Sequence, residues 1–114
     1  MKYMLLFCGT EEDRRAFEAM TPEALQVQLG RVLEWQRRHE AQILSGARLA
    51  PRESATTVRR ENGKPLITDG PFMEGKEELG GYVLVEVEDR DAALTIAKEW
   101  PAGPVEVRPV IETP

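Results

Sequence analysis

The 114-residue sequence predicts an α+β fold of the ferredoxin-like, split βαβ kind, with an antiparallel sheet and an added β-hairpin. Apolar runs of strand length are separated by segments that have the apolar spacing and the capping residues of helices. The pair Asn62-Gly63 joins two β-prone runs, which is a strong hairpin signal. The expected order is strand, helix, hairpin, strand, helix, strand, in one domain over residues 1–114.

The chain is expected to begin with a strand and a short helix. Residues 2–8 (KYMLLFC) form a short apolar run that stops at Gly9, which favours a buried strand. Thr10 and Asp13 match a capping box, with a hydroxyl at the cap and a carboxylate three residues later. That pattern predicts a helix over about residues 11–19.

A longer helix is expected to start at Thr21 and Pro22, because threonine caps free backbone N–H groups and proline suits the first helical position. Its apolar stripe has three- and four-residue spacing and extends to about Leu44, where Ser45-Gly46 would end the helix. The stripe consists of Leu25, Leu29, Val32, Gln36, His39 and Ile43.

The second half of the chain is expected to hold the hairpin and the rest of the sheet. The hairpin pairs residues 56–60 with residues 66–68 across Asn62-Gly63. The later elements are a strand over 81–88, a helix over about 90–99 that is capped by Asp89, and a strand over 105–111.

Apolar residues occupy both faces of two predicted strands. In residues 2–8 and 81–88, the positions that face one way and those that face the other are both mostly apolar. Two helices cover one face of a sheet, and an exposed second face forgoes burial worth roughly 25 cal/mol per Å². We therefore expect a homodimer in which two sheets pack face to face.

Composition narrows the classes of partner. The net charge of −5 argues against nucleic-acid binding, which depends on Lys and Arg neutralising phosphates. The longest apolar run, residues 3–8, is far shorter than the roughly 20 residues that span a bilayer, and no secretory cleavage pattern follows it. We expect a cytoplasmic protein without nucleic-acid or membrane partners, in which Cys8, the only cysteine, is a small buried hydrophobe.

Residues 68–82 (TDGPFMEGKEELGGY) gather most of the candidate site residues. Asp69 has two interpretations: a catalytic general base, if burial raises its pKa, or an Asx-turn residue that accepts nearby backbone N–H groups. Gly70 and Pro71 would set the path of the loop. Phe72 is expected to anchor it in the core or in the dimer interface.

Glu74 and Lys76 are the main ligand-binding candidates, in a mixed-charge group that continues with Glu77 and Glu78. The group is interpreted either as a ligand-binding cleft edge or as a solvated loop with weak surface pairs. Carboxylate oxygens also suit a divalent cation, but the loop has no recognisable metal-ligand spacing. We expect neither a metal nor another cofactor.

Tyr82 and His39 are two further candidates. Tyr82 is expected either to pack in the core or interface, or to line a pocket and bind a ligand there. His39 lies on the apolar stripe of the long helix, and it is interpreted either as a partly buried structural residue or as a catalytic group.

Several stretches resemble the DGPF branch of the YCII-related family, and the resemblance runs from end to end. Its most specific part is the Asp69-Gly-Pro-Phe motif with the residues that follow it. The matching stretches are Met1-Lys-Tyr-Met-Leu-Leu, Ala55-Thr-Thr-Val-Arg, Thr68 to Phe72, Glu74, Lys76-Glu77, Leu79-Gly-Gly-Tyr82 and Val105 to Val110.

The resemblance implies a dimeric α+β barrel of ferredoxin-like subunits and little about activity. Some YCII-like relatives have a His-Asp pair for which an enzymatic role is proposed, whereas His39, the only histidine here, falls near the end of the long helix. DGPF relatives often accompany extracytoplasmic-function sigma factors, which implies a regulatory or interaction role.

The sequence therefore leaves three possible functions. We favour a small-molecule-binding protein or small enzyme with a site near the DGPF loop, because the polar residues are gathered there. The alternatives are a regulatory protein that works beside a sigma factor and a non-catalytic dimeric scaffold.

Overall fold

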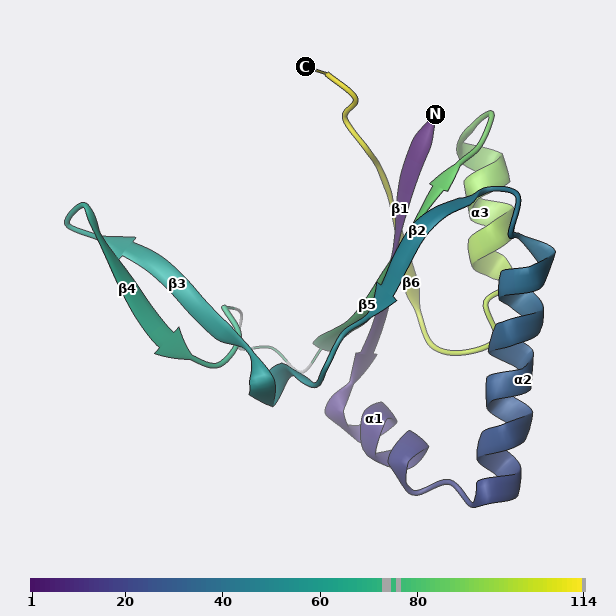
Figure 1. Ribbon diagram of the computed structural model, residues 1–114, viewed down its shortest axis with the longest axis horizontal. Helices are drawn as coiled ribbons and strands as arrows, with labels where there is room; N and C mark the ends of the chain where they lie inside the picture. Colours follow the sequence, from purple (N-terminus) through teal and green to yellow (C-terminus); the bar gives the residue numbers. More distant parts are fainter. Residues whose placement is uncertain (73–74, 76, 114) are drawn as a thin grey trace.

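The computed structural model describes residues 1–72, 75 and 77–113, so the predicted ligand residues Glu74 and Lys76 lie outside the described residues. Figure 1 shows the arrangement of the elements. In chain order they are β1 (Lys2–Thr10), α1 (Glu11–Glu18), α2 (Pro22–Arg38), β2 (Ile43–Arg48), the short 3-10 helix η1 (Arg52–Ser54), β3 (Thr56–Glu61), β4 (Lys64–Asp69), β5 (Glu77–Glu86), α3 (Arg90–Lys98) and β6 (Val105–Pro109).

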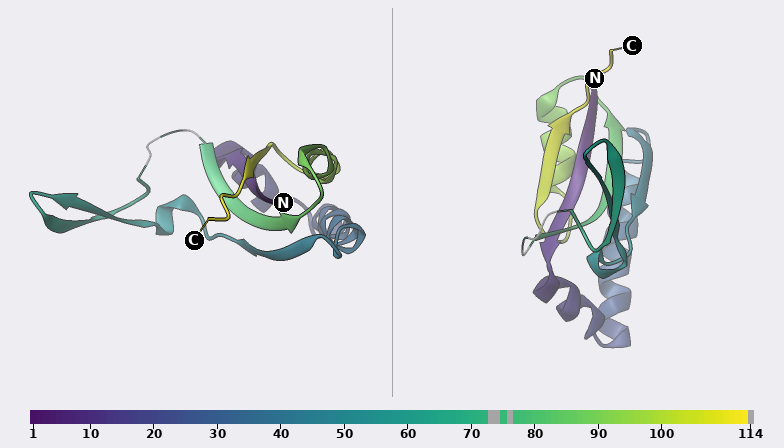
Figure 2. Two further views of the ribbon diagram at one scale, coloured as in Figure 1. Left: turned by 90° about the horizontal axis from the view of Figure 1, so that it is seen from above. Right: turned by 90° about the vertical axis from the view of Figure 1, so that its left-hand side faces the viewer.

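Four strands form the main sheet in the order β2-β5-β1-β6, and each neighbouring pair is antiparallel. Strands β3 and β4 form a separate two-stranded hairpin. Helices α2 and α3 lie on the same side of the sheet (Figure 2). The predicted α+β class, the antiparallel sheet and the added hairpin are therefore confirmed.

The core lies between this inner face of the sheet and the helices. Burial alternates along β1 and β5, because successive side chains of a strand point to opposite faces. The buried apolar residues are Tyr3, Leu5, Trp35, Val83, Val85, Ala93 and Ile96.

The intervening side chains form what we call the outer face, which none of the described helices covers. Cys8 lies there and is half-buried rather than fully buried as expected, and burial raises the pKa of its thiol, with a smaller contribution from the Glu106 carboxylate. By strand register the outer face comprises Met4, Leu6, Cys8, Ser45, Ala47, Tyr82, Leu84, Glu106 and Arg108.

The predicted extension of the long helix to Leu44 is wrong. Helix α2 ends at Arg38, and residues 43–48 form β2, the edge strand beside β5. Ile43 continues the apolar spacing of the helix in sequence, but its side chain packs against the core from β2. Gly46, predicted to end the helix, instead allows close strand approach, since a Cβ there would lie 2.9 Å from the Tyr82 backbone oxygen.

The helix starts follow the capping residues as predicted. The Thr10 hydroxyl accepts from the Asp13 N–H while the Asp13 carboxylate accepts from the Thr10 N–H, and these bonds complete a capping box for α1. Thr21 caps α2 and Asp89 caps α3 in the same way, through one side-chain oxygen each. No helix among the described residues is long and apolar enough to cross a membrane.

The hairpin β3–β4, which we call the arm, projects away from the body of the molecule (Figures 1 and 2). Asn62 and Gly63 both have positive φ at its tip, as predicted from the Asn-Gly pair. The Cα radius of gyration is 16.4 Å, whereas a compact domain of this length has about 13 Å. Val58 and Ile67 on the arm are 63% and 69% exposed, so the described residues do not cover these two apolar side chains.

Substitutions at two glycines, one in the sheet and one in a helix, test the close packing of the sheet. A Cβ on Gly81 would lie 2.7 Å from the Ala47 backbone oxygen of β2, whereas a Cβ on Gly30 in α2 would meet nothing within 4 Å. We predict that Gly81→Ala destabilises the protein by about 2 kcal/mol through overpacking. Gly30→Ala is the matched control, and it should stabilise the protein by up to about 1 kcal/mol through helix propensity. Urea unfolding measures both, and equal effects would contradict this packing.

Candidate functional site

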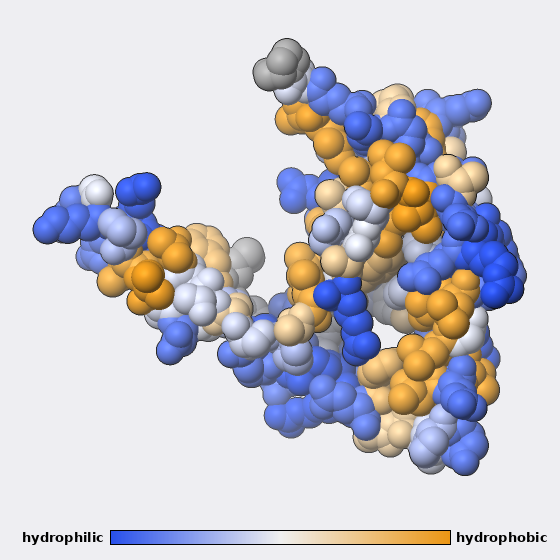
Figure 3. Space-filling view, viewed as in Figure 1, coloured by the Kyte–Doolittle hydropathy of each residue, from blue (hydrophilic) through white to orange (hydrophobic). Residues whose placement is uncertain are grey.

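A large hollow separates the N-terminal part of α2 from the inner face of the sheet. Trp35 is the only buried residue of α2, so the helix contacts the core near its C-terminal end. The space between helix and sheet has a volume of about 1030 Å³. Figure 3 shows it opening to the surface between the sheet and α2.

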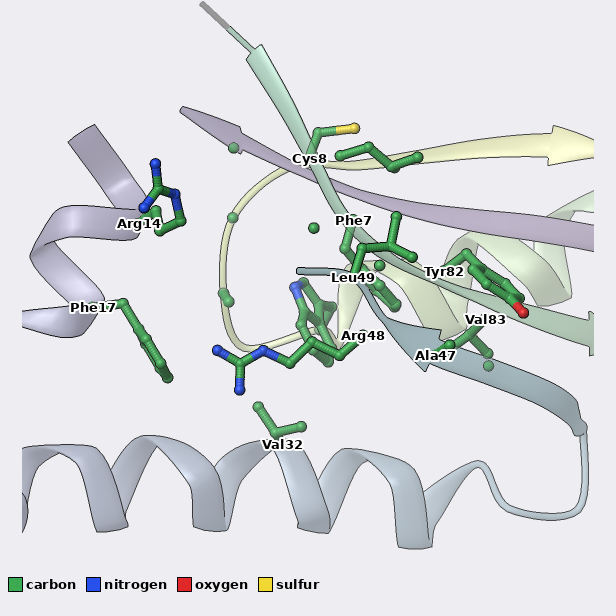
Figure 4. Close-up of a pocket in the computed structure, with 18 of the residues that line it drawn as sticks. Phe7, Cys8, Arg14, Phe17, Val32, Ala47, Arg48, Leu49, Tyr82 and Val83 are labelled. Carbon is green, nitrogen blue, oxygen red and sulfur yellow. The ribbon is translucent and has the colours of Figure 1, made fainter. Parts of the chain in front are cut away.

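The walls of the hollow are largely apolar. They come from the inner sheet face, from α1, from α2 and from the segment that joins α3 to β6. Figure 4 shows Val32 rising from α2 toward the sheet and Phe17 entering from α1. The apolar lining includes Phe7, Phe17, Leu29, Val32, Trp35, Val83 and Trp100.

One end of the hollow, beside α1, carries an ion-pair network centred on Arg14. Its Nε donates to Glu78 Oε2 at 3.1 Å, and its other nitrogens reach Glu53 at 2.8 Å and Glu18 at 3.3 Å. The hydrogen bond to Glu78 is the main cause that raises the pKa of Arg14. Arg14 therefore joins α1 to β5 and to η1, and it closes this end of the hollow.

Glu78 is the most buried acid of this network. Its side chain is 9% exposed, and its second carboxylate oxygen, Oε1, has no hydrogen-bond partner among the described residues. Buried carboxylate oxygens are rarely left unpaired, because the lost hydration is not replaced. Glu78 Oε1 is therefore a buried acceptor without a described partner, on a residue that lines the hollow.

Arg48 supplies the second polar group. It pairs with Gly81 at the end of β2, and its side chain crosses the hollow toward α1 (Figure 4). Its guanidinium carbon lies 5.5 Å from the centre of the Phe17 ring, and it forms no ion pair with a described residue. The aromatic contact holds a charged fork in the hollow with its donors available.

The residues of the DGPF motif lie at the end of the arm and directly after it, and none of them lines the hollow. Asp69 ends β4 opposite Thr56, is exposed, and its side chain makes no hydrogen bond to a described residue. Gly70 has φ +106, and its N–H donates to the Ala55 carbonyl at 2.8 Å, which fixes the path of the chain beyond the arm. Phe72 is 66% exposed and lies under the Arg59 guanidinium at 4.9 Å, so it is not part of the core of its own chain.

The other two candidates, Tyr82 and His39, lie on β5 and at the end of α2. Tyr82 contributes to the lining of the hollow, but its side chain belongs to the outer face because its neighbour Val83 is buried inward. His39 is the residue after the last turn of α2, is 8% exposed, and lies with Nε2 3.4 Å from Glu99 Oε2. Neither His39 nor Asp69 lines the hollow.

The acid beside His39 is held in its charged form. Arg38 donates to Glu99 at 2.8 Å, and this hydrogen bond is the largest cause that lowers the pKa of Glu99, with a further contribution from His39. This cluster joins the C-terminal ends of α2 and α3, so it has a structural explanation. In the part of the chain that the structure describes, no group of three His, Cys, Asp or Glu side chains is arranged to hold a metal.

Of Arg14, Arg48 and Glu78, sequence reasoning missed the two arginines. Glu78 was included in the mixed-charge group, but Arg14 and Arg48 were not singled out. Arg48 could have been found from the short run of residues before Pro51. That run is recognised as part of a strand only if the long helix ends at Arg38. Arg14 gave no signal, since a charged residue on a short surface helix is ordinary.

The comparisons with known proteins identify the family. The model of the YCII-related domain matches residues 1–114, which is the whole chain. The chain belongs to the YCII-related domain family. A relative in Rhizobium meliloti (strain 1021) is 39% identical over 69 residues, and it is described as an uncharacterised protein. The aligned part covers 56% of this YCII-related chain and 56% of that relative.

The lowered pKa of Glu99 predicts a pH dependence of stability. Because the folded-state pKa is below the ordinary value of 4.5, the stabilisation by Glu99 is present above that pH and is lost as the pH falls through the folded-state pKa. Glu99→Gln should therefore lower the thermal midpoint at pH 7 and show no difference from wild type at about pH 2. Glu88→Gln, which changes an exposed glutamate, is the control. A constant difference at all pH values would contradict the assignment.

Proposed function

We propose that this YCII-related domain binds a small organic molecule in the hollow between α2 and the sheet. The observation that carries the proposal is a cavity of about 1030 Å³ with mostly apolar walls and with charged side chains from α1, α2, β2 and β5 in its lining. Ligand sites usually have volumes of about 300–1,000 Å³ and this same combination of walls and polar groups. The cavity therefore has the size and the composition of a ligand site.

The polar groups support binding of a polar head rather than of a purely apolar molecule. The guanidinium of Arg48 is available for an anionic or acceptor group, and Glu78 lines the same cavity with a second charged group. Glu78 is also the group that would accept a proton if the domain is an enzyme, because it is a buried carboxylate inside the cavity. Glu78 follows the DGPF motif in the sequence, at the start of β5.

We further propose that two copies pair through their outer faces, as a dimeric barrel of ferredoxin-like subunits. Met4, Leu6 and Leu84 give that face an apolar centre, and Glu106 and Arg108 place opposite charges side by side on its edge strand. A twofold axis lets such a pattern complement itself, because each acid can meet the base of the other copy. The exposed apolar side chains of the arm favour the same assembly.

Filling the hollow tests the ligand proposal. Val32→Trp adds a large ring inside the cavity without removing a charge, and we predict that it weakens any ligand found for the wild-type protein at least about tenfold. Val27→Trp is the matched control, because Val27 is on the same helix, is 58% exposed and does not line the hollow. A metabolite screen by thermal shift, followed by calorimetry, measures this. A ligand whose affinity is unchanged in Val32→Trp binds elsewhere and contradicts the proposal.

A charged substitution on the outer face tests the proposed dimer. Leu84→Glu should convert a dimer into a monomer at micromolar concentration, because it buries two unpaired carboxylates across the twofold axis. Val27→Glu changes an exposed apolar residue away from that face and should leave the dimer intact. Sedimentation velocity distinguishes the two. A monomeric wild-type protein would refute the dimer and leave the ligand proposal unaffected.

A further inference from the structure

We propose that the arm is an interaction surface for a second copy of this chain, and that the DGPF motif holds the root of that surface. In this arrangement the arm of each copy packs along the body of a partner that is seated on the outer face. The inference rests on the proposed dimer and adds the contact that the arm makes. It is carried by the exposed apolar side chains of the arm, by the bonds at its root and by its position relative to the sheet.

Both faces of the arm carry exposed apolar side chains. Val58 and Ile67 lie opposite each other in the ladder and share one face, because directly paired residues of an antiparallel hairpin point the same way. The other face has Leu66 paired with Arg59, whose guanidinium lies over the Phe72 ring, and Leu66 and Phe72 are 44% and 66% exposed. A two-stranded hairpin without cover is marginally stable at best in water. The arm therefore gains stability when another molecule covers it.

The root of the arm is held by hydrogen bonds of the DGPF motif. The Gly70 N–H donates to the Ala55 carbonyl at 2.8 Å, and the Thr57 hydroxyl donates to the Gly70 carbonyl at 2.6 Å. On the other side of the root, Glu53 of η1 pairs with Arg14 of α1 at 2.8 Å. These contacts set the direction of the arm before a partner binds. A preorganised surface loses less conformational entropy on binding, which favours affinity.

The arm stands on the outer-face side of the sheet. In Figure 1, helices α2 and α3 lie on one side of the sheet and the arm extends on the other, and in the right-hand view of Figure 2 the arm stands in front of the strands. Each of its strands has six residues, so the arm is about 20 Å long at roughly 3.3 Å per residue. Sheets that pack face to face are about 10 Å apart. The arm is therefore long enough to run past the sheet of a partner on the outer face and to reach the helices of that partner.

Charge favours the body of another copy as the molecule that the arm contacts. The arm, residues 56–69, has three basic and two acidic residues, whereas the whole chain has 15 basic and 20 acidic ones, so the net negative charge lies outside the arm. A weakly basic arm is attracted to an acidic body and is not attracted to a second basic arm. The twofold symmetry of a dimer also gives each body one arm, so both arms are covered at once.

Sedimentation velocity of the full chain over a range of concentrations tests the inference with two arm variants. Val58→Thr and Ile67→Thr keep a β-branched side chain, and with it the strand propensity, but they remove apolar surface from the arm. Each should weaken the dimer at least about threefold, and the double variant about tenfold or more. Val27→Thr is the matched control, because Val27 lies on α2 and is 58% exposed, and it should leave the dissociation constant unchanged. Circular dichroism shows whether each variant is folded.

Contacts between subunits give a second measurement, which needs no substitution. Dimers form from a mixture of isotope-labelled and unlabelled wild-type chains, and filtered nuclear Overhauser spectra then report only the contacts between copies. The methyl groups of Val58 and Ile67 should show such contacts, whereas those of Val27 on α2 should show none.

The outcomes separate the arm from the dimer on which it depends. A dimer that keeps its affinity in both arm variants, and that shows no contact between copies from Val58 or Ile67, would overturn the inference and leave the outer-face dimer standing. Arm contacts in a dimer that Leu84→Glu leaves intact would also overturn it, because they would place the partner away from the outer face. A monomeric wild-type protein would contradict both the arm contact and the dimer.

Discussion

The packing of Trp35 is the interaction on which the rest of the structure depends. The indole N–H donates to the Ile96 carbonyl at 2.9 Å, and the ring meets Phe7 and Trp100 edge to face. This side chain packs α2 against the sheet and α3, and the Arg38–Glu99 ion pair joins the same two helices at their C-terminal ends. Because no other residue of α2 is buried, the rest of the helix stands away from the sheet and leaves the hollow.

Helix α1 adds charged and aromatic side chains to that hollow. Arg14 ties the helix to Glu78 of β5, and Phe17 on the same face supports Arg48 of β2. Arg14, Arg48 and Glu78 thus lie among the residues that line the cavity, together with the aromatic side chains of Phe7, Trp35 and Trp100. Cavities with apolar walls and a few polar groups orient a ligand as well as hold it.

Most of the fold follows from local signals in the sequence. The capping residues Thr10 and Thr21 and the Asn62-Gly63 turn each act over a few residues, so they could be read without knowing the tertiary structure. Strand β2 was missed because Gly46 resembles a helix terminator, whereas its role is to allow contact with a strand more than thirty residues away in sequence. Long-range approach of this kind has no local signature.

The site was less predictable than the fold for the same reason. The hollow exists because α2 stands at a certain distance from the sheet, and that distance depends on the contacts of Trp35 with residues of other elements. Asp69 and His39 attracted attention as chemically versatile residues, yet the first lies on the arm and the second lies beside Glu99. Chemical type alone does not tell which residues a fold brings together.

The central claim is that α2 is fastened at Trp35 and stands off the sheet at Val32. Carbon-edited nuclear Overhauser spectra of the free protein test it most directly, because they report which side chains are in contact. The account predicts strong contacts from the Trp35 ring to Phe7 and Trp100, and none between the methyl groups of Val32 and Val83 on opposite walls of the hollow. Strong Val32–Val83 contacts would mean that the helix lies against the sheet, and they would contradict the account.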